Sequence, residues 1–151
     1  MATRPQHTTT LQLRRTFPAP RERVFRAWTT PEEMKRWQAP RPMTTPLAEV
    51  DLRVGGKYRV HMRAPDGAEH RVAGVYREVD PPRRLVYTWA WESGPDQTET
   101  LVTVEFFDRG GATEVVLTHA LFSAEEARGR HEHGWTGCLD NLAEALAADS
   151  E

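Results

Sequence analysis

The fold is decided by the stretch KYRVHMRAPDG at residues 57–67. In its first part Tyr58, Val60 and Met62 alternate with basic side chains, a period of two that is typical of a strand with one buried face. Asp66-Gly67 is a pair that favours a tight hairpin turn, because both residues tolerate the left-handed backbone that such turns need. The stretch therefore predicts one strand, a turn and an antiparallel partner strand.

The same alternation continues on both sides of this hairpin. Gly55-Gly56, Pro81-Pro82, Gly94-Pro95 and Gly110-Gly111 interrupt the patterned segments and mark turns between them. Strands joined by short turns are antiparallel neighbours, so the middle of the chain predicts a meander with one buried face. The predicted strands cover residues 8–17, 49–53, 57–64, 71–79, 84–91, 100–107 and 113–121.

Two short helices are expected between the first strand and the meander. Pro20 suits the first turn of a helix, and Val24 and Trp28 share one face of it, with Trp28 as plain core. Thr30 is positioned to cap the second helix, and Glu33 would complete a capping box with it.

The chain ends in a long predicted helix. Ser123 and Glu126 fit a capping box at its start. Gly129, Gly134 and Gly137 each weaken a helix by about 1 kcal/mol relative to alanine. They predict a kink or a frayed turn in its first half, or else a close approach of the helix backbone to another surface. Apolar residues recur at helical spacing at Trp135, Leu139, Leu142 and Leu146.

These elements predict an α+β fold in one domain over residues 1–151, with its core at about residues 11–147. A chain of 151 residues has the size of one ordinary domain and needs no disulfide to fold. The long helix is the only predicted element able to cover the buried face of the sheet. A curved antiparallel sheet wrapped around this helix leaves a gap between them, which is a natural place for a ligand.

Composition excludes several classes of function. The formal net charge is −2 with both signs interspersed, so no basic stripe for nucleic acid is expected. No apolar run approaches the ~20 residues of a spanning helix, and residues 1–10 lack the apolar segment of a secretory signal. We therefore expect a cytoplasmic protein without membrane insertion. The single cysteine, Cys138, excludes an intramolecular disulfide and a multi-cysteine metal site, and we expect no cofactor.

Five tryptophans are many for this length. A buried tyrosine or tryptophan must satisfy its polar tip, and packing so many into one small core requires many partners. A pocket with water or a ligand relieves that demand, so we expect a small hydrophobic molecule to be bound there, with core packing as the alternative for each residue. The predicted wall consists of Trp37, Tyr58, Val60, Met62, Tyr76, Tyr87, Trp89, Trp91, Val104, Phe106, His119, Trp135 and Leu139.

The order and spacing of these motifs resemble the bacterial proteins related to the activator of the heat-shock protein 90 ATPase, within the START-like (SRPBCC) superfamily. The resemblance runs from about Leu11 to Leu146. It implies a helix-grip fold of the Bet v 1-like kind, with lipids, polyketides or other hydrophobic molecules as the usual ligands and no fixed catalytic set. The motifs that carry it lie at residues 20–28, 37, 54–58, 66–67, 74–80, 84–89, 102–106, 113–119 and 134–142.

Two alternative functions follow from the same resemblance. Some superfamily members are cyclases or dehydratases, and His119 is the only candidate acid or base for such a reaction here. The other alternative is an interaction module like the eukaryotic co-chaperone, which carries a further N-terminal domain that we do not expect in this chain. A homodimer is compatible with the sequence, which does not decide it.

Single residues favour binding over catalysis and leave the question of an enzyme open. His119 ends an inward-facing strand pattern, and we interpret it first as a structural group and second as a polar anchor or general acid/base. His131 and His133 do not face the same way on a helix, so we interpret them as solvated surface and expect no metal site. Cys138 lies beside the apolar stripe and is interpreted as a small buried hydrophobe.

Overall fold

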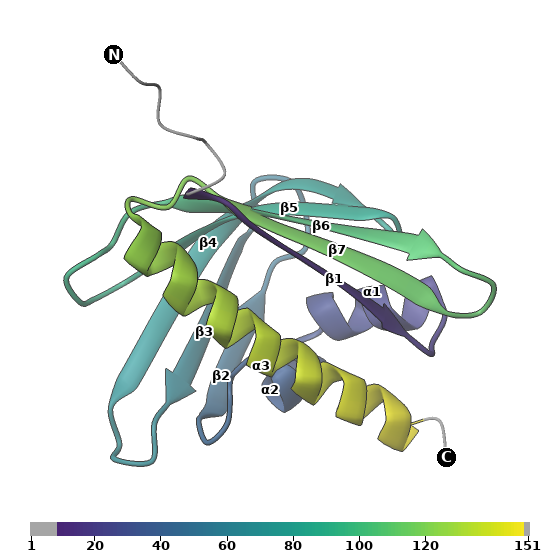
Figure 1. The fold of residues 1–151 in the computed structure, drawn as a ribbon, viewed down its shortest axis with the longest axis horizontal. Helices are drawn as coiled ribbons and strands as arrows, with labels where there is room; N and C mark the ends of the chain where they lie inside the picture. Colours follow the sequence, from purple (N-terminus) through teal and green to yellow (C-terminus); the bar gives the residue numbers. More distant parts are fainter. Residues whose placement is uncertain (1–8, 150–151) are drawn as a thin grey trace.

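Seven antiparallel strands form one sheet in the computed structural model, which describes residues 9–149 (Figure 1). Their spatial order is β1-β7-β6-β5-β4-β3-β2, so β1 and β2 are the edges. A long helix, α3, crosses the sheet, and two short helices pack near its C-terminal end (Figure 1). The predicted α+β fold, a curved antiparallel sheet around a long C-terminal helix, is confirmed. In chain order the elements are β1 (Leu11–Phe17), α1 (Arg21–Thr29), α2 (Pro31–Trp37), β2 (Thr44–Val50), β3 (Lys57–Arg63), β4 (Glu69–Asp80), β5 (Arg84–Trp91), β6 (Thr100–Asp108), β7 (Thr113–Ala120) and α3 (Glu125–Asp149).

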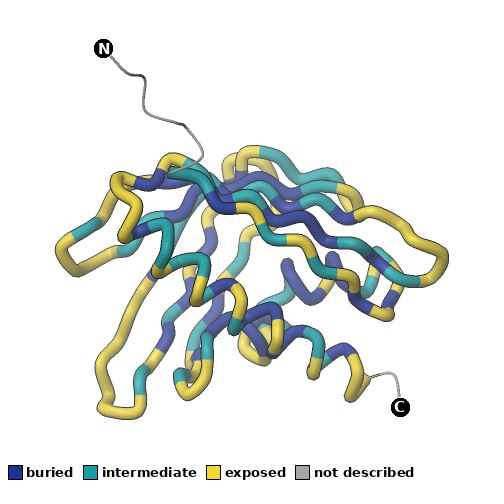
Figure 2. Tube along the Cα trace, in the orientation of Figure 1, coloured by how far each residue is buried: buried dark blue, intermediate teal, exposed yellow. Residues whose placement is uncertain are grey.

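The hairpin of β3 and β4 forms as its sequence predicts. Asp66 accepts a hydrogen bond from the backbone N–H of Ala68 at 2.9 Å, and this bond closes the turn. Tyr58, Val60 and Met62 are buried, while the basic residues between them point away from the core. The period of two thus gives β3 one buried face, and Figure 2 shows buried and more exposed residues alternating along the strands.

Strand β2 begins earlier than the sequence predicts. It covers Thr44–Val50 instead of residues 49–53, although Pro46 lies inside it. A proline is tolerated here because β2 is an edge strand and its register with β3 shifts between Thr44 and Leu47. At the other edge, β1 covers Leu11–Phe17, and the predicted start at residue 8 lies outside the described residues.

Neither predicted capping box forms. Thr30 occupies the N-cap position of α2, but its side chain makes no cap hydrogen bond. The Glu33 carboxylate accepts hydrogen bonds from Arg23 and Arg36 instead. Helix α3 begins at Glu125, after the predicted cap residue Ser123, whose hydroxyl donates to Asp96 at 2.9 Å. Glu33 and Ser123 therefore each form hydrogen bonds with residues outside the predicted capping box.

Helix α3 runs from Glu125 to Asp149 without a break, so the predicted frayed turn is wrong. The alternative explanation of the glycines is confirmed at one position. A Cβ placed on Gly137 would lie 3.1 Å from the Cβ of Pro40, so the missing side chain lets α3 approach the segment between α2 and β2.

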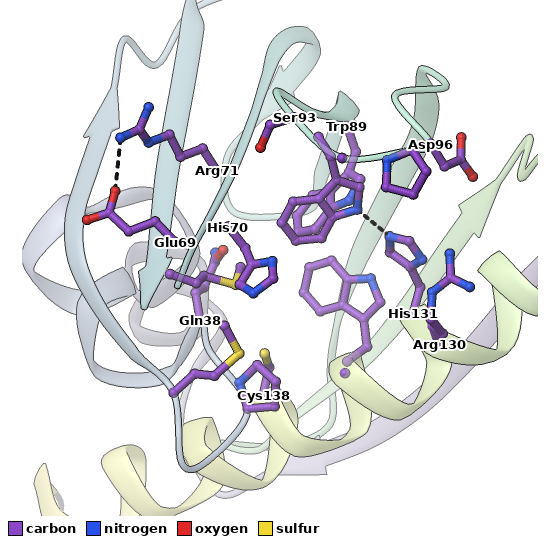
Figure 3. A pocket seen from close by; sticks show the side chains of 18 residues that line it. Gln38, Glu69, His70, Arg71, Trp89, Ser93, Asp96, Arg130, His131 and Cys138 are labelled. Carbon is purple, nitrogen blue, oxygen red and sulfur yellow. Dashed lines mark hydrogen bonds and ion pairs between the residues drawn. The ribbon is translucent and has the colours of Figure 1, made fainter. Parts of the chain in front are cut away.

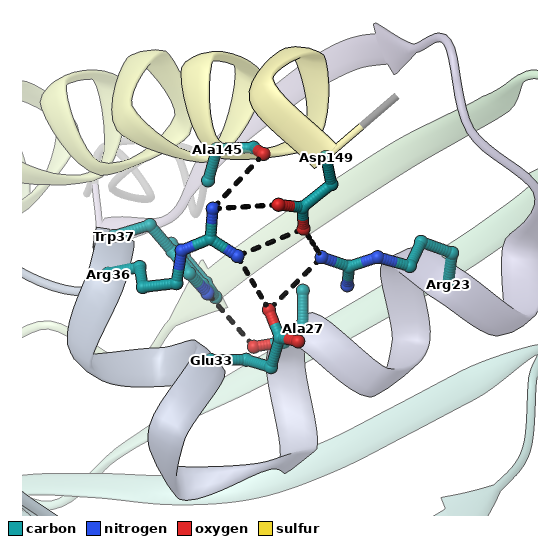
Figure 4. A network of polar contacts seen from close by, with 7 residues as sticks. All are labelled: Arg23, Ala27, Glu33, Arg36, Trp37, Ala145 and Asp149. Atoms are coloured by element: carbon teal, nitrogen blue, oxygen red, sulfur yellow. Dashed lines mark hydrogen bonds and ion pairs between the residues drawn. The ribbon is translucent and has the colours of Figure 1, made fainter. Parts of the chain in front are cut away.

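The C-terminal half of α3 closes the core. This half contributes three buried leucines, Leu139, Leu142 and Leu146. Its last turn is tied to the two short helices: Arg36 donates to both Asp149 oxygens at 2.9 and 3.0 Å, and Arg23 also contacts this carboxylate (Figure 4). Across residues 9–149, neither α3 nor a shorter helix has the apolar length to cross a membrane.

Candidate functional site

A cavity of about 610 Å³ lies between the first half of α3 and the sheet (Figure 3). This volume is within the roughly 300–1,000 Å³ typical of small-molecule sites. Four parts of the chain line it: the segment after α2, the β3–β4 hairpin, the end of β5 with the loop that follows, and α3. Exposed side chains such as His70, Arg71 and Arg130 belong to its lining, so the cavity opens to the surface.

One face of α3 supplies the helical wall of the cavity. His131, Gly134, Trp135 and Cys138 are spaced three, four and seven residues apart, which places them on the same side of a helix. A Cβ placed on Gly134 would meet no atom within 4 Å. The absent side chain therefore leaves free space in this wall.

Aromatic rings form the opposite wall. Trp89 and Trp91 lie two residues apart on β5, and their ring centroids are 5.6 Å from each other. The Trp89 ring is also 5.2 Å from that of Trp135 on α3, so the indoles bridge sheet and helix. Apolar surface of this kind favours flat hydrophobic molecules.

His131 belongs to this aromatic wall, so its interpretation as solvated surface is wrong. Trp91 donates its indole N–H to His131 Nε2 at 2.9 Å. His131 Nδ1 lies 2.7 Å from the carbonyl oxygen of Ala127, which can only accept, so Nδ1 carries the proton. Burial lowers the pKa of His131, which keeps this arrangement neutral. His133, by contrast, is exposed as predicted.

His119 is fully buried beside the cavity in a directed chain of hydrogen bonds. Trp135 donates to His119 Nδ1 at 3.0 Å. Thr100 Oγ1 lies 2.7 Å from Nε2 and donates its own proton to the Trp89 carbonyl at 2.9 Å, so Nε2–H must donate to Thr100. Burial, with a smaller effect of nearby His131, lowers the pKa of His119 to about 2. Both ring nitrogens are thus engaged in a neutral structural group.

The cavity lining includes some of the predicted wall residues and not others. Met62, Trp89, Trp91 and Trp135 line it. The other predicted wall residues pack in the core, where hydrogen bonds satisfy several of their polar tips. For example, the Tyr58 hydroxyl donates to the Thr88 carbonyl at 2.5 Å and the Trp37 indole to that of Ala27 at 2.9 Å. The residues outside the lining are Trp37, Tyr58, Val60, Tyr76, Tyr87, Val104, Phe106, His119 and Leu139.

Sequence reasoning missed the part of the lining that comes from connecting segments. Gln38, Pro40 and Met43 follow α2, and residues 93–96 follow β5. These segments have no hydrophobic period that marks an inward direction. Cys138 does line the cavity, and burial raises the pKa of its thiol to about 12, which fits its interpretation as a neutral apolar group.

Charged groups gather at the mouth of the cavity. Glu69 accepts hydrogen bonds from Arg63 and Arg71, each at 3.0 Å, and these arginines hold its pKa below the usual value. Arg130 has no hydrogen-bond or ion-pair partner within residues 9–149. In the same range no three His, Cys, Asp or Glu side chains are grouped so that they could hold a metal ion.

Comparison with known proteins gives the same architecture. The AHSA1 protein from Silicibacter pomeroyi matches with a TM-score of 0.83 at 28% identity, over 93% of this chain and 99% of that one. Protein CV1439 from Chromobacterium violaceum matches with a TM-score of 0.84 at 26% identity, over 91% and 96% of the two chains.

Sequence relatives with curated names are longer proteins. The human activator of 90 kDa heat shock protein ATPase homolog 1 is 27% identical over 128 residues, which is 85% of this chain and 34% of that protein. The chain therefore spans about a third of the length of the curated relatives that it matches. The family model described as "Activator of Hsp90 ATPase homolog 1-like protein" matches residues 18–147, which include α1, α2, all of α3 except its last two residues, and all strands except β1. On this evidence, the chain belongs to the Activator of Hsp90 ATPase homolog 1-like family.

Proposed function

We propose that this protein binds a small hydrophobic or amphipathic molecule in the cavity between the sheet and the first half of α3. The observation that carries the proposal is the cavity itself, about 610 Å³ with Trp89, Trp91 and Trp135 in its wall. Burial of apolar ligand surface against these rings would supply most of the affinity, at roughly 25 cal/mol per Å² before ordering costs. A cytoplasmic location is part of the same proposal.

The state of His119 supports binding rather than a cyclase or dehydratase reaction. A general acid or base must reach the substrate with a nitrogen that can exchange a proton. Both nitrogens of His119 are engaged by Thr100 and Trp135, and the residue does not line the cavity. His131 does line it, yet Trp91 and the Ala127 carbonyl take both of its nitrogens.

A titration with the dye 8-anilinonaphthalene-1-sulfonate tests the proposal. Because three tryptophans line the cavity, excitation of tryptophan should produce energy transfer to the bound dye. We expect saturable binding with one site per chain and a rise in melting temperature. Native mass spectrometry of freshly purified protein should detect any molecule that co-purifies. A folded protein that shows no saturable dye binding, and carries no small molecule, would contradict the proposal.

A second candidate function is contact with a chaperone of the 90 kDa heat shock class. It is supported by the 27% identity to the human activator over 128 residues, and it concerns only the third of that protein that this chain matches. The test is the ATPase rate of the chaperone with and without this protein. A saturable increase in the ATPase rate supports the contact. An unchanged rate, together with no complex in gel filtration, would contradict this second candidate function.

A further inference from the structure

One buried carboxamide in the cavity wall lacks a partner. Gln38 follows the last residue of α2 and is only 4% exposed. Its side chain makes no hydrogen bond to a residue in the range 9–149, and its amide atoms are not among the fully enclosed atoms that lack a partner, so they are accessible. Figure 3 includes it among the side chains that line the cavity. The carboxamide therefore brings both a donor and an acceptor to an otherwise apolar part of the wall, next in sequence to the lining residues Pro40 and Met43.

Several polar groups near Gln38 have partners, although the Trp89 indole N–H in the same lining has none within residues 9–149. Asn141, the other buried amide side chain nearby, donates to the Ala39 carbonyl at 2.8 Å. Trp91 and Trp135 donate to histidines. Buried polar side chains are nearly always hydrogen-bonded, because an unpaired one costs the free energy of its lost hydration. A buried amide that faces a cavity thus indicates a polar atom on the molecule that fills it.

We propose that Gln38 determines ligand specificity by hydrogen bonding to a hydroxyl or carbonyl oxygen on an otherwise apolar molecule. This inference rests on the proposed binding function and narrows it. The ligand class is alcohols, phenols and ketones with a large apolar body, in preference to plain hydrocarbons. The oxygen lies at the inner end of the ligand, since Gln38 is buried while the charged lining residues Arg71 and Arg130 are exposed at the mouth.

Isothermal titration calorimetry with 2-naphthol and 2-methylnaphthalene tests this role. The two compounds share their rings and differ by a hydroxyl in place of a methyl group. The wild-type protein should bind 2-naphthol about fivefold more tightly, the factor expected of one hydrogen bond. Gln38→Met keeps the length of the side chain and removes the amide, so the preference should disappear. The control Met43→Leu changes the same wall without changing its polarity, and should keep the preference.

The outcomes separate this inference from the function on which it rests. Equal affinity of the wild type for both compounds, or an unchanged ratio in Gln38→Met, would overturn the role of Gln38 and leave cavity binding standing. No saturable binding of either compound or of the dye would overturn both. Should Gln38→Met fold poorly, the wild-type protein still decides the matter: the side-chain NH₂ signals of Gln38 should shift in NMR spectra with 2-naphthol and not with 2-methylnaphthalene.

Discussion

The two halves of α3 cover the same sheet but make different interfaces with it. The C-terminal half presents Leu139, Leu142 and Leu146 and is closed by packing. The first half presents Gly134 and His131 and borders the cavity. The difference lies in side-chain volume along one helix face, because a leucine fills the space that a glycine leaves. The cavity therefore depends on the residues of the helix as much as on the curvature of the sheet.

The two halves are also held in different ways. At the C-terminal end, Asp149 accepts hydrogen bonds from Arg36 at the protein surface. At the cavity, the fixing contacts are buried and neutral: Trp91 donates to His131, and Trp135 donates to His119. Buried neutral hydrogen bonds orient side chains without charges that would disfavour an apolar ligand. The contrast predicts where substitutions destabilise the fold and where they alter binding.

The largest effect is expected in the closed half. Leu142 is 0% exposed, so Leu142→Ala leaves a cavity in packed surroundings and should lower the free energy of unfolding by about 2–5 kcal/mol. Met43→Ala enlarges a space that is already open and should cost clearly less. Urea unfolding measures both. Equal losses would mean that the two halves do not differ in packing.

Acid should destabilise the folded protein through His119. Its pKa is about 2 in the folded protein, against 6.5 for the free side chain. Below pH 6.5 the unfolded chain therefore binds a proton at His119 that the folded chain does not bind. The contribution of neutral His119 to the free energy of unfolding is fully present above this pH and decreases as the pH is lowered. The contribution is up to about 1.4 kcal/mol per pH unit. Urea unfolding at pH 6.5, 5.5 and 4.5 measures it.

His119→Leu separates this contribution from that of the carboxylates. At neutral pH the substitution leaves the Trp135 N–H unpaired and should cost about 1–3 kcal/mol of unfolding free energy. The variant should also lose part of the acid dependence of the wild type. If wild type and variant lose stability in parallel between pH 6.5 and 4.5, then His119 is not held neutral by the fold.

Alanine at the helix glycines should stabilise the protein slightly. Gly129 and Gly134 both lie within α3, and a Cβ on either would meet no atom within 4 Å. Gly129→Ala and Gly134→Ala should each raise the free energy of unfolding by about 1 kcal/mol through helix propensity alone. Thermal unfolding measures the gain. A loss confined to Gly134→Ala would mean that the cavity wall is packed at this point.

The smallest effect is expected at the end of the closed half. Asp149→Asn removes the charge that Arg23 and Arg36 share, in an exposed setting where ion pairs contribute little. We expect faster amide hydrogen exchange in the last turn of α3 and unchanged exchange at Trp135. Faster exchange along the whole helix would show that the two halves open together.

The sequence predicted the elements better than the site. The alternation of Tyr58, Val60 and Met62 and the turn at Asp66-Gly67 depend on local periodicity, which one chain reveals. The Tyr58 hydroxyl, in contrast, is satisfied by a carbonyl on another strand, a partner that no local pattern identifies. Gln38 lies in a connecting segment where no period indicates its direction.

The position of His131 in the cavity wall could have been predicted from the sequence. It lies four residues before Trp135, which places it on the apolar face of the helix. Its interpretation as surface came from comparing it with His133 alone. The general lesson is that a polar residue on a helix is placed by its neighbours three and four residues away, because these share its side of the helix.

Dye binding by two leucine variants tests the central claim most directly. Gly134→Leu should fill the cavity from α3, because Gly134 lines it with free space beside it. Gly129→Leu adds the same side chain to the same helix outside the lining, and serves as the matched control. We predict that both variants fold and that only Gly134→Leu loses saturable binding of 8-anilinonaphthalene-1-sulfonate. Wild-type binding by a folded Gly134→Leu variant would contradict a ligand site beneath the first half of α3.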